Sequence, residues 1–276
     1  MLFNLFRKKT VVHLYTILWN EENMLEYFFR YYDPVVDKYI FFDDGSTDAT
    51  LEILSKHPKA EIRSLPRLEV DSYVLAAKEI HDNCWKESRG KADWVIITAI
   101  DEFLYTSNLR SYLSDCKAKK ITAIPALGFQ MISRTLPVAG ENLIKTVTRG
   151  CPFAPINKLS IFDPDKIQET NYHVGRHVAE PIGEVKYPDK DILFNLHYKC
   201  LSFEDTFKRH NDLQNKLGTV DKQNQWGIHY SWAKDRFKTE WDYFEQNSVD
   251  NIFSNKDKLT VQHSLLAERW WHKYEI

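Results

Sequence analysis

The sequence predicts an α/β fold, with a Rossmann-like and mostly parallel sheet flanked by helices and a helical extension at the C-terminus. Two observations support this prediction. Up to residue 126, short stretches rich in β-branched and aromatic residues alternate with stretches that repeat apolar residues at helical spacing, which is the pattern of a parallel α/β sheet. From residue 202 onward the pattern is mostly helical and rich in tryptophan, at positions Trp226, Trp232, Trp241, Trp270 and Trp271.

The first strands and the helix between them follow from local signals. Residues 11–18 and 38–42 are short runs of apolar and β-branched residues, so we expect strands there. Between them, a helix begins after Asn20 and ends at Asp33, because the proline that follows Asp33 disfavours helical backbone before it.

The next elements are read in the same way. Thr47 or Asp48 caps a helix that ends at residue 54. The further expected strands are 60–65, 94–100 and 120–126, and the further expected helices are 71–87 and 107–116. After residue 127 the alternation becomes short, and proline, glycine and histidine become more frequent.

The composition is that of an ordinary globular protein. Of the 276 residues, 43% are hydrophobic and 28% are charged, and the net charge is -2. There is no basic run beyond 7–9, which argues against nucleic acid as a partner, because nucleic-acid affinity depends on clustered lysine and arginine. No long linker interrupts the chain, so we expect one compact domain with a C-terminal extension.

The cysteines and the N-terminus bear on the compartment. The four cysteines (Cys84, Cys116, Cys151 and Cys200) form no Cys-x-x-Cys pair, and no apolar run is long enough to span a membrane. Residues 1–9 place their charges after the apolar residues, unlike a signal peptide. We therefore expect free thiols in a cytoplasmic protein with no transmembrane segment. For residues 1–9 three alternatives stay open, which are a disordered tail, an edge strand, and a segment that contacts the inner face of a membrane.

Carboxylates follow two of the expected strands. Asp43 and Asp44 follow 38–42 in the run Asp-Asp-Gly-Ser-Thr-Asp, and Asp101 and Glu102 follow 94–100. The carboxyl ends of parallel strands meet at one edge of a sheet, so we expect these acids to face one ligand. Acids in this position bind a ribose hydroxyl, a base N–H, or a divalent cation with a diphosphate. For each acid alone, a helix N-cap or a solvated charge is the alternative.

These segments resemble a known family. Residues 15–54, with Asn-Glu after the first strand and Asp-Asp-Gly-Ser after the second, resemble family 2 glycosyltransferases of the GT-A fold. Residues 94–105 resemble the Asp-Trp…Asp-x-Asp-Glu-Phe segment of a branch related to family 92. The Lys-Leu-Ser-Ile run at 158–161 and the His-Tyr-Lys run at 197–199 are similar to later segments of that branch. The resemblance covers about residues 11–210.

The resemblance implies roles for the acids and for one histidine. Asp44 would contact the nucleotide base and Glu21 the nucleoside, with Asn20 and Asp43 beside them as nucleotide-binding residues. Asp101 and His197 would hold a divalent cation, Mn or Mg. One departure concerns the first acid of the Asp-x-Asp motif, which is Ala99 in this sequence, so one contact to the ribose or the metal is missing.

The same resemblance leaves the catalytic base and the acceptor side less defined. Glu102, His177 and Glu180 are the candidate bases, in that order. Lys158 and His173 are candidates to contact a phosphate or the acceptor. His173 and His177 are spaced like metal ligands on a helix. Gly175 lies between them and disfavours a helix, so we expect a loop near the acceptor.

The resemblance also implies a function and a division of the chain. It predicts an inverting, metal-dependent glycosyltransferase that moves a sugar from a nucleotide-sugar donor to the hydroxyl of a glycan or lipid-linked glycan, as in polysaccharide biosynthesis. The expected parts are a tail at 1–10, a nucleotide-sugar-binding half at 11–126, an acceptor-side half at 127–210 and a helical extension at 211–276.

Two alternatives stay open. A non-catalytic module that binds glycan or nucleotide is favoured by the alanine at position 99. A sugar nucleotidyltransferase needs a basic, glycine-rich loop near the N-terminus, and Asn20-Glu21-Glu22 stands there instead. The sequence contains no Gly-x-Gly-x-x-Gly after the first strand and no Gly-x-Ser-x-Gly, which argues against a nucleotide-dependent oxidoreductase and against a hydrolase with a nucleophile elbow.

Overall fold

A computed structural model describes residues 9–254, 256–264 and 269–274. Within this part of the chain, a nine-stranded sheet has the order β3-β2-β1-β4-β8-β6-β11-β5, with β7 paired to β6. The predicted tail at 1–10 lies almost wholly outside the described residues. No helix in the described ranges is both long and apolar enough to cross a bilayer.

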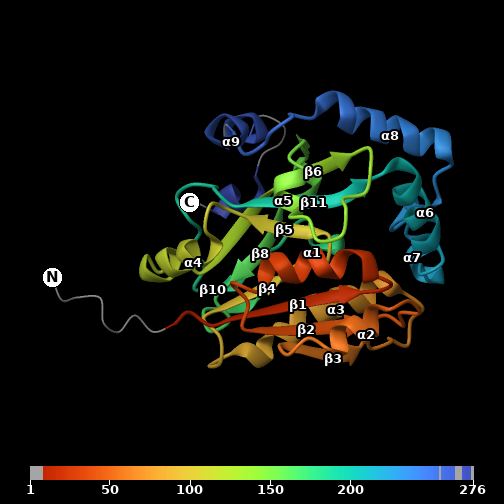
Figure 1. Cartoon of the computed structure of the whole chain (residues 1–276). Coiled ribbons are helices and arrows are strands. Elements are labelled where there is room, and N and C mark those ends of the chain that lie inside the picture. Colours follow the sequence, from red (N-terminus) through yellow and green to blue (C-terminus); the bar gives the residue numbers. More distant parts are fainter. Residues whose placement is uncertain (1–8, 255, 265–268, 275–276) are drawn as a thin grey trace.

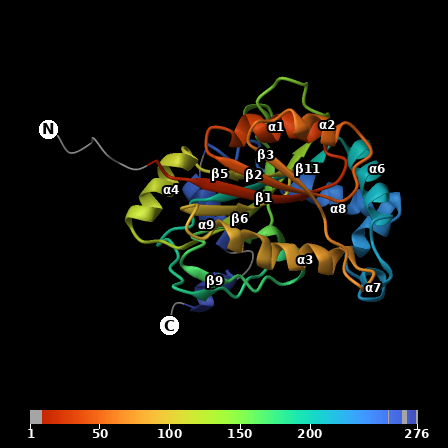
Figure 2. The same ribbon diagram turned by 90° about the horizontal axis from the view of Figure 1, so that it is seen from below.

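The first half of the sheet is parallel. It consists of β1 (Val12–Leu18), β2 (Lys38–Asp43), β3 (Ala60–Ser64) and β4 (Trp94–Ile97). Figure 2 shows α1 (Glu22–Tyr32) and α2 (Thr50–Ser55) on one face of these strands and α3 (Tyr73–Asn83) on the other. The short 3-10 helix η1 (Cys84–Ser88) continues α3 toward β4.

The second half of the sheet is mixed. β8 (Lys158–Phe162) runs antiparallel to both β4 and β6 (Ala123–Ser133), and β11 (Phe194–Leu201) runs parallel to β6. β5 (Glu102–Tyr105) and β7 (Gly150–Pro152) pair antiparallel with β11 and β6. β9 (Ile167–Glu169) and β10 (Ile182–Gly183) form a separate pair.

The remaining helices surround the second half. They are α4 (Leu109–Ala118), α5 (Leu143–Thr146), α6 (Phe203–Gln214), α7 (Thr219–Gln223), α8 (Lys234–Asn247) and α9 (Lys256–Ser264), with the 3-10 helices η2 (Ala154–Ile156), η3 (Val174–Arg176), η4 (Ile228–Ser231) and η5 (Trp270–Tyr274). In Figure 1, α6 and α7 lie at one end of the sheet, and α8 and α9 lie at the edge away from β3.

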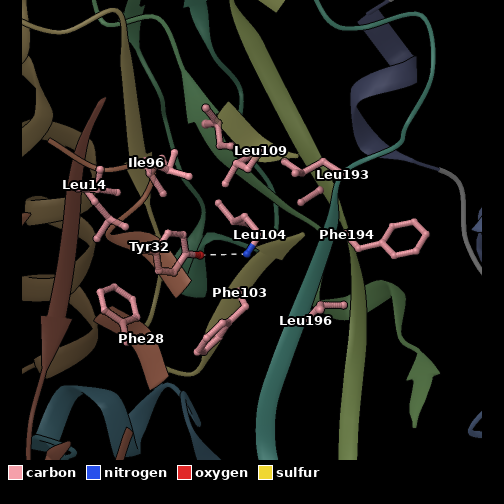
Figure 3. Close-up of a cluster of buried hydrophobic side chains, with 14 of the residues drawn as sticks. Leu14, Phe28, Tyr32, Ile96, Phe103, Leu104, Leu109, Leu193, Phe194 and Leu196 are labelled. Atoms are coloured by element: carbon pink, nitrogen blue, oxygen red, sulfur yellow. Dashed lines mark hydrogen bonds between the residues drawn. The ribbon is translucent and has the colours of Figure 1, made fainter. Parts of the chain in front are cut away.

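The main core joins the two halves through α1 (Figure 3). Phe28 packs edge-on against Phe103 of β5, with ring centroids 6.4 Å apart. The buried Tyr32 hydroxyl donates to the Glu102 carbonyl and accepts from the Leu104 N–H, both at 2.9 Å. Because these bonds fix the backbone of β5, they also fix the turn that leads from β4 into it.

One helix cap comes from the C-terminal region. The Ser72 hydroxyl caps α3 by accepting from the Leu75 N–H at 3.0 Å. The buried Asp221 carboxylate of α7 accepts from that same hydroxyl and, at 2.8 Å, from the Tyr73 N–H. A side chain almost 150 positions later therefore completes the first turn of α3.

The α/β prediction is confirmed, and the expected strands at 11–18, 38–42 and 60–65 correspond to β1, β2 and β3. β4 is shorter than expected, because the backbone turns after Ile97. β6 is longer than the expected strand and continues to Ser133. β5 was not expected at all, so Glu102 lies in a buried strand rather than in a loop. The predicted boundary between the nucleotide-sugar-binding half and the acceptor-side half, at residue 127, falls inside β6. This division of the chain by function stays a prediction.

Candidate functional site

The acids predicted to face one ligand do lie at one edge of the sheet. β2, β1 and β4 are parallel neighbours in that order, and Asp44, Glu21 and Asp101 follow their carboxyl ends. β1 lies between β2 and β4, so the two strands that were predicted to end in acids are not direct neighbours. The Asp101 carboxylate is nonetheless close enough to raise the pKa of Glu21, after the larger effect of burial. Asp44 and Glu21 both contribute to the raised pKa of Tyr73, which arises mainly from burial.

Two of the predicted nucleotide-binding residues bind the loop itself. The Asn20 carboxamide accepts from the Thr47 N–H at 2.7 Å and donates to the Thr47 hydroxyl at 3.3 Å. The Asp43 carboxylate accepts from the N–H groups of Gly45 and Ser46, at 2.9 and 3.1 Å. Both side chains therefore hold the loop after β2 in its conformation. The backbone N–H groups that they bind already have an acceptor and are not free for a ligand.

The other two predicted nucleotide-binding residues pair with cations. Asp44, which is 2% exposed, forms ion pairs with Arg67 and, at 3.3 Å, with Lys216. Glu21 pairs with Arg209 of α6 at 2.7 Å. Burial raises the pKa of Glu21 to about 8, although the Arg209 guanidinium lowers it. Cations from α6 and from the segment after it therefore cover the acidic edge, at the end of the sheet where α6 and α7 lie (Figure 1).

Asp101 and His197, the predicted cation ligands, lie side by side. The His197 Nε2 atom lies 3.3 Å from the Asp101 carboxylate. The other ring nitrogen, Nδ1, lies 2.9 Å from Oε1 of the buried Gln130, whose amide nitrogen donates to the carbonyls of His197 and Met131. Because the amide nitrogen donates to those two carbonyls, Oε1 must accept from Nδ1–H. The Nε2 atom therefore faces Asp101, to which it donates when it carries a proton and beside which it can bind a cation when it does not.

This arrangement fits a divalent cation. A metal-ligating histidine usually donates its other N–H to a fixed acceptor, which is the role Gln130 has here. The separation of 3.3 Å is near that of adjacent ligands bound at about 2.1 Å to one ion. Within the described residues, no group of three or more His, Cys, Asp or Glu side chains is placed to hold a metal. A cation at this pair would therefore take its remaining ligands from substrate and water.

Glu102, the first candidate base, is a structural ion-pair residue. It is 1% exposed and pairs with the buried Lys158 and, at 3.1 Å, with the buried Arg176. It also accepts from the N–H of Ala99 at 3.2 Å and from the hydroxyl of Thr98 at 3.4 Å. Burial alone would raise the pKa of Glu102, but Lys158 and Arg176 hold this pKa well below its ordinary value. The carboxylate is therefore buried and held by two cations, which argues against the predicted catalytic role.

The predicted acceptor-side residues divide into two groups. Lys158 is buried against Glu102, so its ammonium is not free for a phosphate. His173 and Glu180 pair with each other at 3.3 Å and are both exposed. His177 lies close enough to Lys158 and Glu102 for both to act on its pKa. Desolvation and then Lys158 lower the pKa of His177, so its ring is unprotonated at neutral pH.

Several residues around the site were not predicted as part of it. They are Arg67, Gln130, Arg176, Lys199, Arg209 and Lys216. Of these, only Lys199 forms no ion pair or hydrogen bond through its ammonium within the described residues. It lies over the ring of Tyr230, 5.0 Å from the centroid. Burial alone would raise the pKa of Asp101, but His197 and, with a smaller effect, Lys199 hold this pKa below its ordinary value.

Comparisons with known proteins place this chain. The sequence model that describes glycosyltransferase family 92 matches residues 16–265 of this chain. Among curated proteins, none matches the sequence. Among solved structures, S. aureus TarS 1–349 is 13% identical at a TM-score of 0.36, over 75% of this chain and 65% of that one. The same fragment in complex with UDP-GlcNAc is 12% identical at a TM-score of 0.36, over 75% of this chain and 66% of that one. A 4-diphosphocytidyl-2C-methyl-D-erythritol synthase is 11% identical at 0.33, over 57% and 77%.

These structural likenesses are too low to support an argument, and the chain spans less than two thirds of either TarS chain. The fold and the acidic edge define an α/β protein with a candidate ligand site at the carboxyl ends of its parallel strands. The family model covers most of the sequence. The chain therefore belongs to glycosyltransferase family 92, which confirms the resemblance seen in the Asp-Asp-Gly-Ser and Asp-Glu-Phe segments.

Proposed function

We propose that this glycosyltransferase moves a sugar from a nucleoside-diphosphate donor to an acceptor hydroxyl, with a divalent cation at Asp101 and His197. The observation that carries the proposal is the orientation of His197, whose Nε2 is directed at Asp101 by Gln130. This pair lies at the same sheet edge as Asp44 and Glu21, which we assign to the nucleoside. The edge thus combines ligands for a cation with acceptors for a base or ribose.

The cations that cover the edge have a role in this proposal. Lys216 and Arg209 now pair with Asp44 and Glu21. A nucleoside that donates hydrogen bonds to these acids would displace the cations toward the diphosphate, where positive charge is favourable. Mn or Mg, when bound, would stabilise the negative charge that develops on the leaving diphosphate. Asn20 and Asp43 keep the loop in shape rather than touch the donor.

We assign the acceptor proton to His177. Its ring is unprotonated at neutral pH, because desolvation and Lys158 lower its pKa. The acceptor oxygen forms a bond to the anomeric carbon, and the bond from that carbon to the diphosphate oxygen breaks, with its electron pair staying on the diphosphate. The proton of the acceptor hydroxyl passes to the His177 imidazole. Attack opposite the leaving group inverts the configuration at the anomeric carbon.

Glu180 is a weaker candidate for the same step. Its carboxylate is paired with His173, whereas His177 lies close enough to Lys158 and Glu102 for both to act on its pKa. We also propose that the acceptor is a glycan or lipid-linked glycan. We further propose a cytoplasmic location for the protein. All four cysteines are free, which agrees with a reducing compartment.

The purified full chain tests the proposal directly. Release of nucleoside diphosphate is measured with UDP-glucose, UDP-galactose, UDP-N-acetylglucosamine and GDP-mannose, each with Mn²⁺, with Mg²⁺ and with a chelator. We expect cation-dependent release from at least one donor. Release of pyrophosphate from a nucleoside triphosphate and a sugar 1-phosphate, with no nucleoside diphosphate released from these donors, would identify a nucleotidyltransferase. A protein that binds UDP with Mn²⁺ but releases nothing would be the non-catalytic module that Ala99 favours.

A further inference from the structure

A small cavity of about 210 Å³ lies between the first strands of the sheet and the segment that follows α3. Ligand pockets for drug-sized molecules measure about 300–1,000 Å³, so this cavity is too small for a nucleotide. It has room for several water molecules or for one small ion. Every side chain of its lining has a polar or charged end, and these side chains are His13, Tyr15, Lys38, Arg63, Glu87 and Lys91.

The cavity is remote from the candidate site. His13 and Lys38 are register partners near the amino ends of β1 and β2, whereas the candidate site follows the carboxyl ends of the parallel strands. His13 lies five residues before Leu18, which is about 16 Å along a strand. None of the described residues that we assign to the donor or to the cation lines the cavity. A ligand in it would therefore be separate from the sugar donor.

Positive charge exceeds negative charge around the cavity. Lys38, Arg63 and Lys91 line it, and Glu87 is the one carboxylate among the described residues of the lining. Glu61, which lies outside the lining, pairs with Lys38 at 2.6 Å and with Arg63 at 2.5 Å. The two carboxylates thus balance two of the three cations. The Lys91 ammonium forms no ion pair or hydrogen bond in the described part of the chain, so the cavity favours an anion.

The cations of the cavity keep donors for a ligand. The ion pairs and hydrogen bonds of the Arg63 guanidinium use Nε and Nη2, which leaves the two N–H groups of Nη1. Lys38 forms one ion pair, and an ammonium has three donors. Three cations from separate elements can therefore donate to the oxygens of one oxyanion, and such charge-assisted hydrogen bonds are strong.

The carboxylate of the lining selects among anions. Glu87 uses Oε1 for its contacts with the Tyr15 hydroxyl, at 3.2 Å, and with Arg63, at 2.9 Å, so Oε2 is left for a ligand. The Tyr15 oxygen also lies 2.6 Å from Oγ of Ser88, which fixes this wall. An ionised carboxylate only accepts hydrogen bonds. It therefore repels an oxyanion without a proton and accepts from one that carries an O–H.

We propose that this cavity is a binding site for inorganic phosphate. Lys91, Lys38 and Arg63 donate to the phosphate oxygens, and Glu87 accepts from the phosphate O–H. Inorganic phosphate keeps at least one proton at neutral pH. Sulfate has none, and a phosphate monoester loses its last proton with a pKa of about 6. The carboxylate thus favours free phosphate over both, and the site does not depend on the proposed function.

Direct binding to the full chain provides the test. Calorimetry at about pH 7.5 and constant ionic strength compares inorganic phosphate with sulfate and with glycerol 3-phosphate. We expect inorganic phosphate to bind at least about tenfold more tightly than either of the other two anions. It should also raise the melting temperature of the protein, because a ligand that binds only the folded chain stabilises it.

Three variants locate the site. Lys91→Ala should weaken the binding of inorganic phosphate about tenfold, because a charge-assisted hydrogen bond is lost. Glu87→Gln keeps the size of the side chain and adds an N–H donor, so the preference for phosphate over sulfate should disappear. Lys56→Ala removes a lysine of α2 that is 70% exposed and does not line the cavity, so binding should not change. The melting temperature of each variant without ligand shows whether it is folded.

The proposal has clear contrary outcomes. It is overturned if inorganic phosphate does not bind, or if sulfate or glycerol 3-phosphate binds as tightly. It is also overturned if folded Lys91→Ala binds phosphate like the wild type, or if Glu87→Gln keeps the preference for phosphate. None of these measurements uses a sugar donor, so a failure of the proposed function would leave them unchanged.

Discussion

The two halves of the sheet hold their polar side chains in different ways. In the first half, carboxylates satisfy nearby backbone, as when Asp43 accepts from the N–H groups two and three residues later. In the second half, polar side chains pair across long stretches of sequence, as Glu102 does with Lys158 and Arg176. The loop after β2 is therefore specified locally, although Asp44, Glu21 and the cap of α3 in the same half depend on residues beyond 200. The second half is assembled only when distant segments meet, and we expect its polar residues to be the more sensitive.

The largest expected effect comes from the buried ion pairs of Glu102. Glu102→Leu leaves two buried cations without a partner and should lower the free energy of unfolding by about 3–5 kcal/mol. In the first half, Glu61→Leu removes the exposed pairs with Lys38 and Arg63, which should cost at most about 1 kcal/mol. Urea unfolding of both variants measures the difference. Equal losses would break the comparison between the halves.

The next effect concerns the cation ligands. Asp101→Ala should lower the rate of cation-dependent donor turnover by about 100- to 1,000-fold, because charge on the leaving group is no longer stabilised. Its melting temperature should stay close to that of the wild type, since Asp101 is partly exposed. Asp189→Ala, on an exposed loop, is the matched control. Wild-type turnover by Asp101→Ala would remove the cation from the proposal.

Gln130 tests whether the second half positions its histidine. Gln130→Leu removes the acceptor for His197 Nδ1–H, so the concentration of Mn²⁺ needed for half-maximal turnover should rise about 10- to 100-fold. Gln130→Glu keeps an acceptor and should restore part of the affinity. Turnover is titrated with Mn²⁺ in the wild type and both variants. An unchanged Mn²⁺ requirement in Gln130→Leu would mean that Gln130 does not orient the ligand.

The smallest expected effect depends on pH. His210 of α6 is 2% exposed and neither ring nitrogen forms a hydrogen bond in the described residues. Burial, followed by Lys199, lowers its pKa to about 2 from an ordinary value of 6.5. Below pH 6.5 the unfolded chain therefore binds a proton that the folded chain does not, and stability falls as the pH falls. At pH 5 this one histidine should cost about 2 kcal/mol.

His210→Phe should remove that share of the pH dependence. Urea unfolding at pH 7.5 and at pH 5 gives the loss of stability for the wild type and for the variant. The loss should be smaller in His210→Phe by about 2 kcal/mol. An equal loss in both proteins would assign the acid sensitivity to other groups.

The first half of the molecule was largely predictable from the sequence. β1 and β2 are apolar runs bounded by turns, and the predicted acids follow them within a few positions of the sequence. Periodicity and turn residues act within a few positions, so such elements can be predicted from one sequence. The placement of Asp44 and Asp101 at one edge followed from the parallel order of the strands.

The second half was less predictable for a physical reason. β5 has only four residues and begins with Glu102, which looks like a loop acid until Lys158 and Arg176 are placed beside it. Gln130 gains its role from His197, 67 positions later in the sequence. No local pattern marks such a residue, because its chemistry depends on strand register.

The cap of α3 by Asp221 has a consequence for biosynthesis. Chains emerge from the ribosome N-terminus first, so the strands β1 to β4 are available for pairing long before residue 221 exists. Until then, the amide of Tyr73 lacks the carboxylate that it meets in the finished protein. A nascent chain stalled before α7 should therefore contain an α3 whose first turn is frayed and open to proteases, and release of the stall should protect it.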